Sequence, residues 1–137
     1  MSSKTKKIWT KAKDVAKDNN RIRAVISRAK EKIQRVASNS EEFQEFRSKV
    51  DVLLRMAKAH ISGEFKAFSW KTILLIVFGL LYFIAPLDVI PDFLPALGYS
   101  DDVSIIYFIF QKLSDDIDRF SEWEITQTKP IDSDKST

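Results

Sequence analysis

The stretch SWKTILLIVFGLLYFIAPLDVIPDFLPALGYSDD, residues 69–102, joins the most apolar run of the chain to a segment rich in proline and aspartate. Sixteen uncharged residues separate Lys71 from Asp88. As a helix they would extend about 24 Å, slightly less than the roughly 30 Å apolar thickness of a bilayer. Because a proline ring disfavours helical backbone in the preceding residue, we expect this helix to end near Ala85, before Pro86.

A second apolar piece, VSIIYFIFQ at residues 103–111, is too short to cross a bilayer alone. The two pieces predict a hairpin of apolar helices, turned by the segment between them. In a membrane, Trp70, Lys71 and Tyr82 would anchor this hairpin at the interface. The alternative is the core of a helical bundle, where a helix that is hydrophobic on all sides is also stable. The sequence favours the membrane.

The rest of the chain also has helical periodicity, so the predicted fold class is all-α, with amphipathic helices packed against the apolar hairpin. Ser40 is placed to begin a helix and Gly63 to end one. We divide the chain into a basic amphipathic region (1–62), the apolar hairpin (63–122) and a polar, disordered tail (123–137).

The charges are unevenly distributed along the chain. Residues 1–38 hold twelve Lys or Arg against three Asp or Glu, whereas residues 72–137 hold four against eleven. This asymmetry predicts an anionic partner for the N-terminal end. Nucleic-acid phosphate is one such partner, but Trp9 is the only aromatic residue among the first 42, too few for base stacking.

We therefore favour an anionic membrane surface as the partner of the N-terminal end. An amphipathic helix around Trp9 would lie on such a surface with its cations among the lipid headgroups. These cations are Lys4, Lys6, Lys7, Lys11, Lys13 and Lys17. The bias of basic residues towards the inner side of membranes places this region in the cytoplasm.

The segment after the apolar run contains two similar units, Asp88-Val-Ile-Pro91 and Asp92-Phe-Leu-Pro95. In each unit the carboxylate can accept hydrogen bonds from nearby backbone N–H groups, and the proline has no N–H to satisfy. Such a segment can reverse the chain without leaving buried backbone groups unpaired. The residues predicted to build this turn are Pro86, Pro91, Pro95, Gly98, for a positive φ, and Ser100, as a helix cap.

The same segment offers a candidate metal site. Asp88, Asp92, Asp101 and Asp102 would approach one another if the hairpin closes, and carboxylates bind Mg²⁺ or Ca²⁺. Their spacing matches no metal-binding motif, so capping and turn formation is the interpretation that we favour. With one histidine, His60, and no cysteine, a transition-metal site has too few soft ligands. No catalytic constellation and no cofactor motif is found.

Residues 80–102, LLYFIAPLDVIPDFLPALGYSDD, closely resemble the signature of the YkvA-like family, a domain of unknown function numbered 1232. The positions that fall on the signature are Tyr82, Pro86, Asp88, Pro91, Asp92, Pro95, Gly98, Asp101 and Asp102. Ser100 stands where the family often has an apolar residue. The resemblance covers roughly residues 65–120 and implies a small, bacterial, membrane-associated protein without an accepted activity.

These observations predict a small membrane-associated helical protein with a non-enzymatic scaffold or interaction role. Its expected location is the bacterial inner membrane, with the N-terminal region in the cytoplasm. The expected partners are membrane lipid and, through the scaffold role, another protein. Two alternatives stay open: a cation-dependent enzyme that uses the four aspartates, and a soluble helical module that binds nucleic acid.

Overall fold

The computed structural model describes residues 3–35, 41–89 and 101–128, with side chains described for 5–35, 44–84 and 105–127. These residues form helices and no strand, which confirms the all-α fold class. The helices are α1 (Ser3–Val15), α2 (Asn19–Arg35), α3 (Glu41–Ser62), α4 (Trp70–Val89), α6 (Asp101–Lys112) and α7 (Ser114–Thr128).

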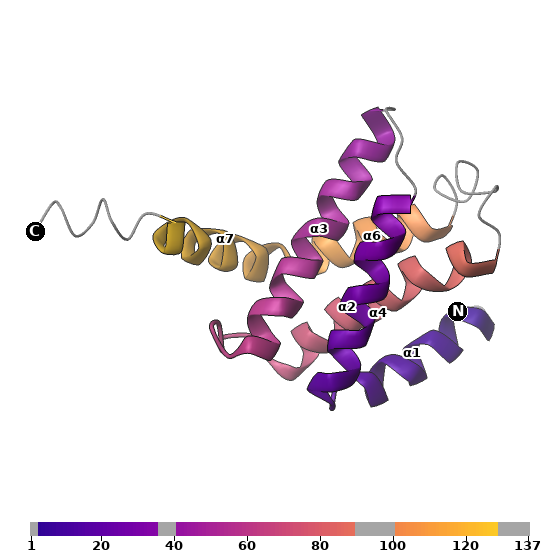
Figure 1. Cartoon of the computed structure of the whole chain (residues 1–137), viewed down its shortest axis with the longest axis horizontal. Helices are drawn as coiled ribbons and strands as arrows, with labels where there is room; N and C mark the ends of the chain where they lie inside the picture. The colour runs from indigo at the N-terminus through magenta and orange to yellow at the C-terminus, as the bar shows by residue number, and fades with distance from the viewer. Residues whose placement is uncertain (1–2, 36–40, 90–100, 129–137) are drawn as a thin grey trace, which may run out of the picture.

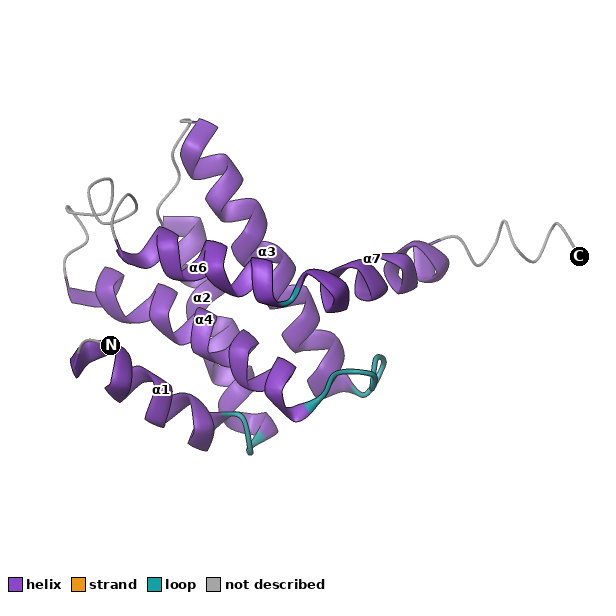
Figure 2. Ribbon diagram, turned by 180° about the vertical axis from the view of Figure 1, so that it is seen from behind, coloured by secondary structure: helices purple, strands orange, loops and turns teal. Residues whose placement is uncertain are grey.

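The apolar helix α4 occupies the centre of the bundle, where it contacts α1, α2, α3 and α6. The helices α1, α4 and α6 lie side by side in one layer, and each neighbour runs antiparallel to α4 (Figure 2). The helices α2 and α3 cross this layer on its other side (Figure 1). The predicted antiparallel hairpin is thus present as α4 and α6.

Between Thr72 and Ile84, every side chain of α4 is buried except Leu75, which is partly exposed. The sequence favours a membrane around this run, but the structure surrounds it with protein. The physical reason is that the apolar stripes of four amphipathic helices converge on it, as the fully buried Leu53 of α3 and Ile106 of α6 illustrate. Within the described ranges, no helix combines the length and the hydropathy needed to cross a membrane.

The end of α4 differs from the prediction. The helix continues past Pro86 to Val89, so the expected end at Ala85 is wrong. Proline removes one backbone donor, and its effect on the preceding residue is a local preference. The preceding turns of α4 are fixed by packing against four helices, and this tertiary packing outweighs the local preference.

Three local features set the helix boundaries. Asp18 caps α2, because its carboxylate accepts hydrogen bonds from the N–H groups of Asn20 (2.9 Å) and Arg21 (3.4 Å). Gly63 ends α3 with a φ of 80°, which confirms the predicted stop. The hydroxyl of Ser69 caps α4 by accepting from an N–H of its first turn.

Gly79 lets α4 approach its neighbours closely. A Cβ built on this residue would lie 3.0 Å from Cδ1 of Ile109 in α6 and 3.2 Å from Cδ1 of Leu53 in α3. Such distances are shorter than ordinary van der Waals contacts. The absence of a side chain at position 79 therefore determines how tightly the centre of the bundle packs.

The last helix, α7, projects away from the bundle (Figure 1). It extends to Thr128, so residues 123–128, predicted as disordered tail, are helical; residues 129–137 lie outside the described chain. Phe120, which is 1% exposed, anchors its first half in an aromatic cluster at the edge of the core. The members of this cluster are Phe65, Phe68, Phe120 and Trp123.

Candidate functional site

The predicted aspartate site falls outside the side chains that the structure describes. Asp88 lies in the last turn of α4, and Asp101 and Asp102 begin α6, but only their backbone is described. Asp92 belongs to the segment 90–100, which is not described. The same holds for Pro91, Pro95, Gly98 and Ser100, of which Ser100 immediately precedes the first residue of α6. The cation site and the turn chemistry therefore stay predictions.

Where side chains are described, no three His, Asp or Glu residues gather in a way that would hold a metal ion. His60 lies near the end of α3, half-buried at the edge of the core. Burial lowers its pKa below the ordinary value of 6.5, because it disfavours the charged imidazolium.

The lysines of the predicted basic N-terminal surface are exposed wherever their side chains are described. Lys6, Lys7, Lys11 and Lys13 of α1 all reach solvent, and so does Lys17 in the following turn. The side chain of Lys4 is not described. Asp14 is the one carboxylate among the described side chains of α1. This helix thus presents a dense cationic surface.

The apolar side of α1 does not face outward. Ile8, Ala12 and Val15 are buried, and α1 packs on α4. The rings of Trp9 and Phe78 meet edge to face, with their centroids 5.2 Å apart. The helix that the sequence predicts to lie on an anionic surface therefore has its apolar stripe packed inside the bundle. The lysines remain available, while the stripe stabilises the fold.

The three predicted interfacial anchors have different environments. Trp70 is 49% exposed, and Lys71 is exposed beside it. Tyr82 is 2% exposed, and its hydroxyl lies 3.4 Å from Oγ1 of Thr5 in α1. Tyr82 thus joins α1 to α4 in the interior, and it does not sit at a membrane interface in this structure.

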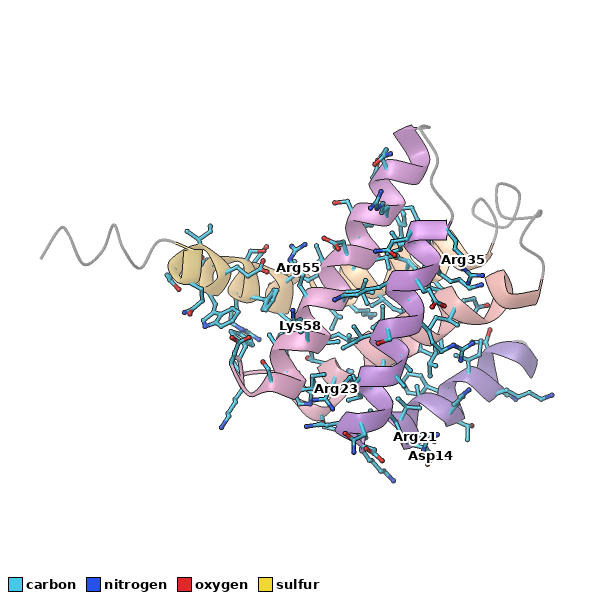
Figure 3. All side chains as sticks on the ribbon, viewed as in Figure 1. Asp14, Arg21, Arg23, Arg35, Arg55 and Lys58 are labelled. Atoms are coloured by element: carbon cyan, nitrogen blue, oxygen red, sulfur yellow. The ribbon has the colours of Figure 1, made fainter. Side chains whose placement is uncertain are left out.

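A second basic surface, to which the sequence assigns no function, lies on α2 and α3. Figure 3 shows Arg21, Arg23 and Arg35 along α2, and Arg55 and Lys58 along α3. The cations of α2 flank a strongly apolar stripe. Helical periodicity therefore predicts that they face outward, but it does not indicate a function for them. Lys32 is the exception, since it is 3% exposed.

Two exposed aromatic residues were also not singled out from the sequence. Tyr107 and Phe108 of α6 are 37% and 50% exposed. Tyr107 donates a 2.8 Å hydrogen bond to Glu45 of α3. Burial raises its pKa, as do the bond to Glu45 and the charge of that carboxylate. Tyr107 and Phe108 belong to the second apolar piece, where hydrophobicity alone predicts burial. Only the position of α3 shows which side of α6 is covered.

Comparisons with known proteins agree with the resemblance noted in the sequence. Residues 72–108, which include most of α4 and the first part of α6, match the model of a family described as "Protein of unknown function (DUF1232)". The chain is 26% identical over 76 residues to "Uncharacterized membrane protein YkvA" of Bacillus subtilis (strain 168). This alignment covers 56% of the chain and 72% of the relative. No solved structure gives a significant match.

Proposed function

We propose that this protein carrying a YkvA-like segment binds the surface of an anionic membrane from the cytoplasmic side, as a non-enzymatic scaffold. The relative that it resembles is named a membrane protein. The observation that carries the proposal is the cationic surface of α1, where four exposed lysines accompany a single carboxylate. Each lysine near an anionic leaflet contributes about 1 kcal/mol of attraction.

The burial of the α1 stripe determines the kind of attachment. Because Ile8 and Val15 are already buried in the bundle, α1 can bind lipid without unfolding it only through the side that carries its lysines. Electrostatic attachment of this kind is screened within about 10 Å at 0.1 M salt. We therefore expect binding that is reversible and sensitive to salt.

Co-sedimentation with vesicles tests the proposal. We expect the protein to bind vesicles that contain phosphatidylglycerol, to lose this binding in high salt, and to ignore pure phosphatidylcholine. A variant with Lys6, Lys7, Lys11 and Lys13 changed to Gln should bind at least tenfold more weakly. A matched variant carries Gln at four exposed cations of other segments: Lys30, Arg47, Lys58 and Lys66.

The two variants have the same net charge, so they separate the surface of α1 from the overall charge of the protein. An equal loss of binding in both would show attraction without a defined surface. Absence of binding to phosphatidylglycerol vesicles at low salt would refute membrane attachment altogether. Preferential binding to an oligonucleotide would favour the nucleic-acid alternative, with its predicted fall in affinity as salt rises.

A further inference from the structure

The helix α4 is incompletely covered by its layer neighbours at one position, Leu75. Phe78 meets Trp9 of α1, and Gly79 approaches Ile109 of α6. Leu75 precedes these two positions by three and four residues, so it lies on the same side of the helix, between them. Leu75 is also partly exposed, unlike the rest of the apolar run. Figure 2 shows α1 and α6 on either side of α4, so Leu75 marks a line along α4 between these two helices.

On one edge of this line, α1 combines an aromatic ring with lysines. Trp9 is partly exposed, although it touches Phe78. Lys6 and Lys13 are three residues before and four residues after Trp9, so they share its side of α1. Both lysines are exposed.

On the other edge, α6 repeats this combination. Tyr107 and Phe110 face α3, since Nζ of Lys49 lies 4.9 and 5.0 Å from the centroids of their rings. Phe108 is rotated about 100° from Tyr107 around the helix, away from α3. Nζ of Lys112 lies 5.5 Å from the centroid of the Phe108 ring.

The two aromatic residues lie at the same level of the layer. Ile106 and Ile109, which bracket Phe108 in α6, both approach Gly79. Trp9 contacts Phe78, the neighbouring position in α4. Phe108 of α6 and Trp9 of α1 therefore lie at the same level along α4, on the two helices that flank it. We call this surface the layer face; its members are Lys6, Trp9, Lys13, Leu75, Phe108 and Lys112.

We infer that the layer face is the surface of the protein that lies on the anionic bilayer, with Trp9 and Phe108 inserted among the headgroups. This inference rests on the proposed function. The charge is complementary: Lys6 and Lys13 border Trp9, Lys112 borders Phe108, and the one carboxylate among the described side chains of α1, α4 and α6 is Asp14. Aromatic rings bordered by lysines suit the boundary between headgroups and acyl chains.

The basic surface of α2 has cations but lacks the aromatic rings of the layer face. The helix α2 is rich in arginine, but its only exposed apolar residue is Ala24. It can add long-range attraction to an anionic leaflet, but it has no side chain to insert. The layer face joins cations with partly exposed aromatic rings on two helices, α1 and α6, and this is the side of the bundle that we expect to meet the membrane.

Neighbouring residues of α6 provide a matched test with phosphatidylglycerol-containing vesicles. Phe108→Ala should weaken vesicle binding about tenfold, and Lys112→Gln about fivefold. The controls are Tyr107→Ala, which removes an exposed aromatic residue from the side of α6 that faces α3, and Lys49→Gln, which removes the lysine of α3 that lies over its ring. We expect both controls to bind as the unchanged protein does. Thermal unfolding followed by circular dichroism checks that each variant is folded.

Tryptophan fluorescence gives an independent measurement. The chain has three tryptophans, Trp9, Trp70 and Trp123. In a variant that keeps only Trp9, brominated phosphatidylglycerol should quench the emission. In a variant that keeps only Trp123, which belongs to the aromatic cluster of α7, it should not.

The possible outcomes separate the orientation from membrane binding itself. If the unchanged protein binds vesicles but the control substitutions weaken binding as much as Phe108→Ala, the inferred orientation is overturned and the proposed function stands. If the unchanged protein does not bind vesicles, the proposed function fails first. An oligonucleotide that binds only when Phe108 is present would reassign the layer face to nucleic acid and overturn the inference.

Discussion

The indole of Trp9 meets the ring of Phe78 edge to face, with a centroid separation of 5.2 Å and an interplanar angle of 79°. This contact joins the first helix of the chain to the central one. It ties α1 to the bundle, so a strongly basic helix is also part of the core. The same ring thus contributes to stability and, under the inferred orientation, to membrane contact.

The first prediction concerns this contact. Trp9→Ala should lower the free energy of unfolding by about 2 kcal/mol, because it removes a large ring and its edge-to-face partner from a half-buried site. Urea denaturation in the absence of lipid measures the change. Trp70→Ala is the control, since Trp70 is 49% exposed and its loss should have little effect. Equal losses in the two variants would contradict the packing of α1 on α4.

The second prediction concerns Gly79. Replacing it with Ala gains about 1 kcal/mol of helix propensity, but it forces Ile109 and Leu53 to move, at a cost of about 1–3 kcal/mol. We expect a small net loss of stability for Gly79→Ala and a loss above about 3 kcal/mol for Gly79→Leu. Ala24→Leu adds the same side chain to an exposed helical position and should be nearly neutral. A stable Gly79→Leu variant would show that α4 and α6 are not in close contact.

The third prediction concerns the attachment of α7. Thr72 Oγ1 donates a 2.8 Å hydrogen bond to Oδ2 of Asp116, whose carboxylate also pairs with Arg119. Thr72 is buried at the start of α4, so Asp116→Ala should cost about 1–2 kcal/mol. A double-mutant cycle with Thr72→Val should give a coupling of about 1 kcal/mol. Asp115→Ala, at the adjacent exposed position, is the control; zero coupling would mean that the two helices are not joined there.

The fourth prediction concerns pH. Burial lowers the pKa of His60 in the folded state, so the unfolded chain binds a proton at higher pH than the folded protein does. The free energy of unfolding should therefore be unaffected by His60 above the ordinary pKa of 6.5. It should fall as pH decreases through that value towards the folded-state pKa.

His60→Gln should remove this contribution. Urea midpoints at mildly acidic and neutral pH, compared between the variant and the unchanged protein, isolate the histidine from carboxylates that titrate lower. An identical pH dependence in both proteins would show that the imidazole is as well hydrated in the folded state as in the unfolded chain.

The sequence by itself determined the helical periodicities, the family resemblance, the stop at Gly63 and the cationic surface of α1. These follow from properties that each residue carries with it: side-chain polarity, charge and backbone freedom. The hairpin of α4 and α6 was also foreseeable, since two apolar segments close in sequence with turn residues between them must pair.

Only the tertiary structure decided the environment of the apolar run. Lipid and a protein core satisfy a hydrophobic helix equally well, so its composition could not distinguish them. Four amphipathic helices converge on α4, and that convergence depends on contacts between residues far apart in the chain. The same contacts carry the helix past Pro86, bury Tyr82 against Thr5, and leave Phe108 exposed while Ile109 is covered.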